Sequence, residues 1–241
     1  MSDSRKQFYD NYVTGFKSQI ADFSSEAIMK YWRWCDFKYL PILNNYGKSS
    51  SILELGCGPG YMLEYLRKKG YSNAKGIDVS PEQVKFAGSM GINVEEANVF
   101  EYLTGNKNSY NIIIALDFIE HFTVDELIIL SKDILGALKP GGMLLLHTPN
   151  AQGFFPGRIM YGDLTHRTFF NPNSLKQLFF MAGFRKIDVY ETSPAPSGLK
   201  GSLHLAAWKS LRVLLNILKT METGGGLDIW TQNMIAAAYK E

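Results

Sequence analysis

Short apolar segments alternate with longer amphipathic segments through the middle of this chain. Strands are predicted where aliphatic residues run together: 51–55, 75–79, 92–95, 110–116 and 143–148. Helices are predicted between these strands, each ending at a glycine or at a Pro-Gly-Gly turn: about 60–69, 81–91 and 124–138. Such alternation predicts an α/β fold, with a parallel sheet covered by helices on both faces.

Beyond the alternating part, the pattern predicts further helices and a long loop. Residues 8–46 carry aromatic side chains at roughly helical spacing, so 1–48 is expected to form an N-terminal helical cap and 49–241 the main domain. A loop rich in Gly and Pro, at about 150–172, is long enough to act as a lid over a substrate. The remaining predicted elements are a helix, two final strands and a helix inserted between those strands: 173–182, 184–191, 231–239 and about 200–222.

Composition limits the class of protein. With 241 residues, of which 46% are hydrophobic, the chain can bury a full core. The 25 basic and 23 acidic residues nearly balance, so no nucleic-acid partner is expected. Cys35 and Cys57 lack the spacing of a zinc site or a disulfide framework. The N-terminus has no apolar leader, and no apolar run is long enough to span a bilayer, so a cytoplasmic protein is expected.

Three alternating glycines follow the first predicted strand, in SILELGCGPGY. The loop lacks the lysine of a triphosphate-binding loop, and its G-x-G-x-G spacing differs from the dinucleotide fingerprint, which disfavours a dehydrogenase. Glu54 would be unfavourable beside a pyrophosphate but favourable beside an ammonium group. Asp78 ends the second strand, where an acid can accept hydrogen bonds from ribose hydroxyls, and Asn98 follows the third strand, where it suits an adenine. Both also fit ordinary turn or helix-capping positions.

Five segments together resemble the successive motifs of class I S-adenosylmethionine-dependent methyltransferases: SILELGCGPGY, GIDVS, ANVFEYL, YNIIIALDFIEHF and LKPGGMLLLHTPN. The similarity covers about residues 50–190. It implies a Rossmann-like, doubly wound seven-stranded sheet whose last strand is antiparallel. The family usually has aspartate where Asn98 stands, which lowers the expected affinity without changing the expected cofactor.

The same resemblance implies S-adenosylmethionine as cofactor and assigns its contacts. The methionine half would meet Glu54, Gly56, Gly58 and Gly60. The ribose would meet Asp78 and Val79, the adenine would meet Asn98 and Val99, and Leu116 would begin the fourth motif.

Two histidines are candidate catalytic residues. The sulfonium is already electrophilic, so the protein has to position a nucleophile and remove a proton where needed. His121 follows the fourth strand and is the leading candidate base, although it also fits a cap of the next helix. His166 lies between Asp163 and Arg167, a group suited to a polyhydroxylated or carboxylated substrate or to bracing the loop. His147 is expected to be a packed strand residue.

A divalent metal is a further alternative. The D-x-x-E-H stretch resembles the E-x-x-E-H of quinone-biosynthesis O-methyltransferases, which makes Asp117, Glu120 and His121 candidate ligands of an ion such as Mg²⁺. A metal there would lower the pKa of an acceptor hydroxyl. Glu-His is also common at this place in methyltransferases without a metal. Tyr9 and Tyr12 either close over the cofactor or belong to the core.

The inserted helix is apolar over most of its circumference between Leu203 and Met221. A narrow polar stripe holds the exceptions: Lys209, Arg212, Asn216 and Lys219. The sequence has no acidic residue between Glu191 and Glu222. This pattern fits a helix at a membrane interface, a homodimer contact or a hydrophobic wall for the substrate.

These features together predict a methyltransferase that acts on a hydroxyl. The TPN and THRTFF segments resemble bacterial enzymes of glycan-assembly pathways, which favours a sugar of a surface polysaccharide or of its lipid-linked precursor. A quinone precursor or another small molecule is the alternative acceptor. A non-catalytic binding subunit that keeps the cofactor fold is a third hypothesis.

Overall fold

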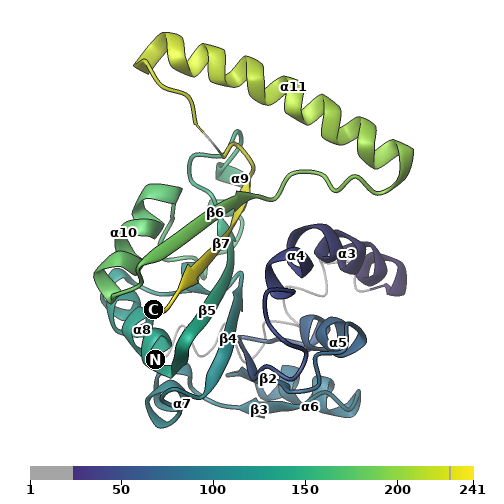
Figure 1. Cartoon of the computed structure of the whole chain (residues 1–241), viewed down its shortest axis with the longest axis vertical. Helices are drawn as coiled ribbons and strands as arrows, with labels where there is room; N and C mark the ends of the chain where they lie inside the picture. Colours follow the sequence, from purple (N-terminus) through teal and green to yellow (C-terminus); the bar gives the residue numbers. More distant parts are fainter. Residues whose placement is uncertain (1–23, 228) are drawn as a thin grey trace.

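Figure 1 shows a computed structural model of the chain, which describes residues 24–227 and 229–241. In chain order the first half contains α3 (Ser25–Lys38), α4 (Leu40–Leu43), β1 (Ile52–Leu55), α5 (Tyr61–Lys68), β2 (Ala74–Asp78), α6 (Pro81–Ser89), β3 (Val94–Glu96), α7 (Val99–Gly105) and β4 (Tyr110–Leu116). The second half contains the 3-10 helix η2 (Ile119–His121), α8 (Val124–Ala137), β5 (Leu138–Pro149), α9 (Gly157–Met160), α10 (Pro172–Ala182), β6 (Lys186–Glu191), α11 (Gly198–Thr223) and β7 (Asn233–Tyr239).

The strands form one seven-stranded sheet in the order β3-β2-β1-β4-β5-β7-β6. Five neighbouring strands, β3, β2, β1, β4 and β5, are mutually parallel, whereas β7 runs antiparallel to both β5 and β6. The predicted Rossmann-like, doubly wound sheet with an antiparallel last strand is therefore confirmed.

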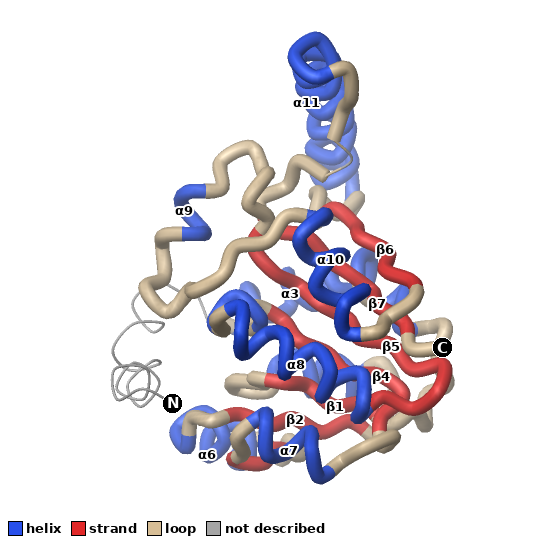
Figure 2. The backbone as a smooth tube through the Cα atoms, turned by 90° about the vertical axis from the view of Figure 1, so that its left-hand side faces the viewer, coloured by secondary structure: helices blue, strands red, loops and turns tan. Residues whose placement is uncertain are grey.

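Two hydrophobic cores lie on opposite faces of this sheet, because successive side chains of a strand point to opposite sides. Leu53 and Leu55 of β1 pack into one core with α7, α8 and α10, whereas Ile52 packs into the other with α3, α4 and α5. Figure 2 shows α7, α8 and α10 in front of the sheet and α3 behind it. The strands are therefore buried on both faces, as the continuous apolar runs in the sequence predict.

The sequence pattern missed one helix and misplaced the start of one strand. The sequence pattern missed α7, which begins directly after Asn98 and buries only Val99 and Leu103, too few residues for a clear helical period. β5 begins at Leu138 instead of residue 143, because the Pro-Gly-Gly segment stays in the sheet: Leu138 pairs with Tyr110, and the backbone N–H of Gly141 donates to Lys240 O at 3.0 Å. A local register shift between Tyr110 and Ile112 absorbs the turn residues.

α11 differs from the other helices because it lies away from the sheet. It projects beyond β6 and β7, to which it is joined by two extended segments (Figure 1). Within its 26 residues only Leu215 is buried. Within the described residues, no helix is both long and apolar enough to cross a membrane.

Candidate functional site

A cavity lies beyond the carboxyl ends of β1, β2, β3 and β4, where the strand order reverses between β1 and β4. This position is the usual ligand site of an open α/β sheet. Most of the predicted cofactor contacts line it: Gly56, Gly58, Asp78, Val79, Asn98, Val99 and Leu116. Glu54 and Gly60 lie outside its lining. His121 and Asp117 also line it, so the candidate base and the cofactor contacts share one cavity.

The glycine loop after β1 requires glycine for two reasons. Gly56, Gly58 and Gly60 all have positive φ angles, of 63°, 52° and 79°, which L side chains rarely adopt. A Cβ atom on Gly56 would also lie 2.5 Å from Cδ2 of Phe118, which follows β4. The loop therefore turns tightly at the end of β1 and leaves its backbone open to the cavity.

Asp78 connects this loop to the end of β2. Its carboxylate accepts hydrogen bonds from the backbone N–H of Gly58 and of Ser80, both at 2.8 Å. These bonds fix the carboxylate at the cavity wall, where a ribose hydroxyl is expected.

Glu54 is a buried carboxyl on β1, with only 4% of its surface exposed. Its Oε2 has no hydrogen-bond partner within the part of the chain that the structure describes. Burial and, secondarily, the nearby charge of Asp78 raise the pKa of Glu54 well above its usual range. A cationic ligand beside this carboxyl would relieve both effects, so the site fits the ammonium group of S-adenosylmethionine.

Asn98 combines two of the roles that its position suggested. It is the N-cap of α7, where its Oδ1 accepts a hydrogen bond from Phe100 N at 3.0 Å, and it also lines the cavity. The capping bond orients the side-chain amide at the wall where an adenine is expected.

His121 ends η2 and is 92% buried, with 8% of its surface exposed at the cavity. Its Nδ1 lies 2.8 Å from Thr165 Oγ1, and that hydroxyl lies 2.6 Å from Asp163 Oδ1. A carboxylate can only accept, so the single hydroxyl hydrogen of Thr165 is donated to Asp163, and the same oxygen accepts from His121. The proton of neutral His121 therefore sits on Nδ1, which leaves the lone pair on Nε2.

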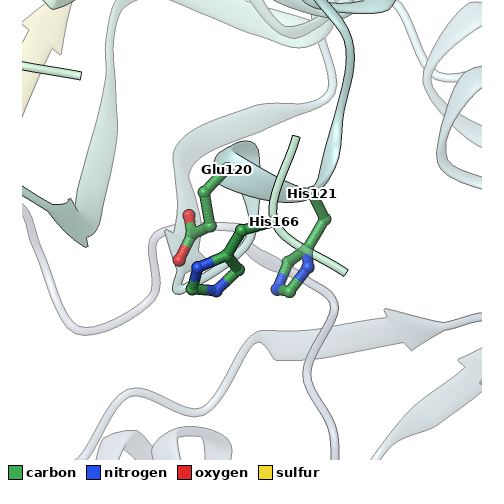
Figure 3. Close-up of side chains that lie close together, drawn as sticks. All are labelled: Glu120, His121 and His166. Atoms are coloured by element: carbon green, nitrogen blue, oxygen red, sulfur yellow. The ribbon is translucent and has the colours of Figure 1, made fainter. Parts of the chain in front are cut away.

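His166 and Glu120 lie beside His121 (Figure 3). The centres of the two imidazole rings are 5.0 Å apart. Glu120 is held by Thr148, whose hydroxyl donates to Glu120 Oε2 at 3.1 Å. One potential ligand atom from each of Glu120, His121 and His166 falls within 4.8 Å of the others. Side chains of this kind can hold a divalent metal.

Asp117, the third metal ligand predicted from the sequence, is not part of this group. Its Oδ1 lies 2.8 Å from Nδ1 of His147, and 58% of its side chain is exposed. His147, on β5, also packs edge-on against Trp34. The candidate metal-binding group therefore includes His166, which was predicted only as a catalytic residue, in place of Asp117.

The long loop 150–172 supplies the residues that surround His121. Asp163 braces this loop by accepting hydrogen bonds from both the backbone N–H of Thr165, at 2.9 Å, and the hydroxyl of Thr165. The backbone N–H of Arg167 donates to Glu120 O at 2.7 Å. Thr165 was missed by sequence reasoning, because nothing local indicates that it meets a residue 44 positions earlier. Tyr9 and Tyr12, expected near the cofactor, lie outside the described residues.

Comparison with known proteins identifies a methyltransferase domain in this chain. A family model described as a methyltransferase domain matches residues 31–189. The ubiquinone biosynthesis O-methyltransferase of Coxiella burnetii (strain Dugway 5J108-111) is 26% identical over 160 residues, which cover 59% of this chain and 66% of that protein. The match thus spans slightly less than two thirds of the relative's length.

Solved structures share the fold. A SAM-dependent methyltransferase from Archaeoglobus fulgidus aligns with a TM-score of 0.67 at 21% identity, over 95% of this chain and 100% of that one. Phosphoethanolamine N-methyltransferase 2 of Haemonchus contortus, in complex with S-adenosyl-L-methionine, aligns with a TM-score of 0.60 at 17% identity, over 96% of this chain and 60% of that one.

Proposed function

We propose that this chain, which belongs to the methyltransferase-domain family, is an S-adenosylmethionine-dependent methyltransferase that methylates a hydroxyl oxygen, with His121 as the general base. The observation that supports this proposal is the hydrogen-bonded series Asp163–Thr165–His121. It holds the imidazole in the tautomer whose Nε2 can accept a proton.

S-adenosylmethionine supplies an electrophilic methyl group. In the proposed complex Glu54 binds the ammonium group, and the glycine loop lies along the methionine half. Asp78 accepts from the ribose hydroxyls, and Asn98 meets the adenine. All four positions meet at the carboxyl edge of the sheet, so the methyl group would be delivered toward η2 and His121.

His121 removes the proton of the acceptor hydroxyl as its oxygen bonds to the methyl carbon. The O–H bond would break and the proton would pass to Nε2, while bound S-adenosylmethionine would supply the methyl group and become S-adenosylhomocysteine. The resulting imidazolium donates its Nδ1–H to Thr165, which in turn donates to the Asp163 carboxylate. That negative charge stabilises the imidazolium until the proton returns to solvent.

For the acceptor we propose a sugar hydroxyl of a surface glycan or of its lipid-linked precursor. Rings from the long loop lie next to His121. His166 packs edge-on against Phe169, and the ring centres of Phe169 and Tyr161 are 5.4 Å apart. Aromatic faces can pack against the C–H groups of a sugar ring. They can also stack on a phenol, and the similarity to ubiquinone biosynthesis O-methyltransferases supports a quinone precursor as the second acceptor class.

The test measures binding and transfer separately. Calorimetric titration with S-adenosylhomocysteine should give binding that Asp78→Ala abolishes. Transfer of a labelled methyl group should then be measured to lipid-linked oligosaccharides and to catechols. His121→Ala is expected to bind S-adenosylhomocysteine normally while transfer falls by about 10² to 10⁴-fold. Equal transfer by His121→Ala and wild type would refute the role of His121, and binding without transfer to any acceptor would favour a non-catalytic subunit.

Thr165→Val tests the orientation of His121. The change removes the acceptor for Nδ1–H, so the pH profile of transfer should shift as the tautomer preference is lost, with little change in S-adenosylhomocysteine binding. Thr168→Val is a matched control in the same loop, because Thr168 donates to Phe122 O instead of contacting His121. An identical pH profile for the two variants would show that Thr165 has only a structural role.

A metal-assisted reaction is the alternative use of the same side chains. If Glu120, His121 and His166 bind a divalent ion, Nε2 of His121 is a ligand and cannot accept the proton. Chelation by EDTA would then abolish transfer, and Mg²⁺ or Mn²⁺ would restore it. The general-base proposal instead expects transfer that is unaffected by EDTA.

A further inference from the structure

α11 is attached to the protein through its polar side. Trp208 Nε1 and Arg212 Nη1 both donate to Glu191 Oε2, at 3.3 and 3.0 Å. Asn216 Oδ1 accepts from Leu227 N at 2.9 Å and from Trp230 Nε1 at 2.8 Å. Arg212 and Asn216, two residues of the polar stripe seen in the sequence, therefore bind the protein body.

The opposite side of α11 is apolar and exposed. Seven side chains, with 53 to 80% of their surface exposed, form what we call the outward face: Leu199, Leu203, Val213, Leu214, Ile217, Leu218 and Met221. At about 3.6 residues per turn these positions fall on one side of the helix, and the small residues Ala206, Ala207 and Ser210 occupy that side between Leu203 and Val213. The 26-residue helix is about 39 Å long at 1.5 Å per residue, so this mainly apolar face extends along most of the helix. Apolar surface of this extent marks an interaction site.

The charges beside the outward face are basic. The sequence has no acid between Glu191 and Glu222, and these two acids pair with Arg212 at 3.0 Å and with Lys219 at 2.7 Å. The other cations of the helix, Lys200 and Lys209, are exposed and belong to no ion pair in the described part of the chain. An apolar strip flanked by lysines complements a surface that is apolar inside and anionic outside.

We propose that α11 binds the surface of an anionic lipid bilayer, with the outward face inserted among the acyl chains and Lys200 and Lys209 at the level of the lipid phosphates. A second copy of this chain is a weaker partner for this face, because α11 carries four Lys and Arg residues but one acid, Glu222, so pairing two such helices would bring excess positive charge together. The helix would lie in the plane of the interface. This proposal does not rest on the acceptor or on the catalytic role of His121.

The test is flotation of the full-length protein with lipid vesicles. Wild type is expected to float with vesicles that contain phosphatidylglycerol, and much less with phosphatidylcholine alone. Ile217→Glu should weaken binding by about tenfold or more, because it places a charge in the inserted face. Ile129→Glu, on α8, is the matched control: Ile129 is 55% exposed and Ile217 is 53% exposed, so only the location differs.

The electrostatic part is tested by Lys200→Glu together with Lys209→Glu. This double variant should bind anionic vesicles at least on the order of tenfold more weakly, and its difference from wild type should shrink as salt increases. S-adenosylhomocysteine binding should be unchanged in every variant, so a loss of flotation is distinguishable from a loss of the cofactor site. Wild type that fails to float, or Ile217→Glu that floats as well as wild type, would overturn the proposal. A wild-type dimer in sedimentation equilibrium that Ile217→Glu dissociates, without any flotation, would assign the face to a second copy.

Discussion

The substitution Glu54→Gln should weaken cofactor binding and at the same time stabilise the cofactor-free protein. Glutamine has nearly the same size and shape but carries no charge. In the proposed complex it would replace a charge-assisted hydrogen bond to the ammonium group by a weaker one. Hydrogen bonds to charged groups contribute about 1.5–3 kcal/mol and neutral ones about 0.5–1.5 kcal/mol, so affinity for S-adenosylhomocysteine should fall by about 5- to 10-fold.

The stability effect depends on pH, and its sign follows from the raised pKa of Glu54. The folded protein holds this proton to a higher pH than the unfolded chain, in which the pKa is near the ordinary 4.5. Between the pKa of the unfolded chain and the raised pKa of the folded protein, the folded state binds more protons, so the free energy of unfolding falls as pH rises. Glu54→Gln removes this loss, so its advantage over wild type in the free energy of unfolding should be absent below pH 4.5 and should grow as pH rises towards neutral.

The assay is urea unfolding of the cofactor-free proteins at mildly acidic and mildly alkaline pH, together with calorimetry of S-adenosylhomocysteine binding. Binding by wild type should also release protons, because the ammonium group favours the ionised carboxyl, and Glu54→Gln should not release them. Glu64→Gln is a control in which the expected change in stability has the opposite sign. The hydrogen bond from Arg67 lowers the pKa of Glu64, so this surface variant should lose stability above the ordinary pKa, by less than about 1 kcal/mol. Unchanged affinity in Glu54→Gln would show that Glu54 does not contact the ammonium group, and unchanged stability would show that its burial has no cost.

Three further predictions concern the loop, the cap of α7 and the thiols. Gly56→Ala should abolish S-adenosylhomocysteine binding in calorimetry and lower the melting temperature, because the new Cβ meets Phe118 at 2.5 Å and the φ angle is positive; normal binding would contradict the close packing of this loop. Asn98→Asp should tighten binding several-fold and raise the melting temperature slightly, since a carboxylate both caps α7 and accepts from an adenine amino group; weaker binding would place the adenine elsewhere. Burial raises the pKa of Cys35 to about 12 and also raises the pKa of Cys57. Both thiols should therefore resist iodoacetamide in the folded protein and react in urea, as mass spectrometry would show. Rapid labelling of the native protein would argue against their burial.

The sheet and the cofactor edge were predictable because their signals are local. A run of aliphatic residues followed by Gly56, Gly58 and Gly60 specifies a buried strand and a tight turn within eleven residues of sequence. Asp78 was predictable for the same reason, since it ends the next strand along the sheet.

Features that depend on tertiary contacts could not be predicted in this way. Thr165 meets His121 only because the long loop folds back over η2. The orientation of α11 was also beyond the sequence, because periodicity shows which residues share a side of a helix but not which side meets the protein. There Glu191 turns the polar side towards the protein by accepting from Trp208 and Arg212.

The way α11 is inserted has a consequence for how this chain can vary. β6 and β7 are antiparallel neighbours, and Glu191 pairs directly with Met234, so the excursion at 192–232 leaves and re-enters the sheet at adjacent points. A short hairpin turn could close the same two strands without changing their register. A version of this protein that lacks α11 should therefore keep the sheet and the cofactor edge provided that residues 229–232 remain. Ile229 is buried in the core, and the backbone carbonyl groups of residues 230–232 accept hydrogen bonds from Asn150 and Phe154.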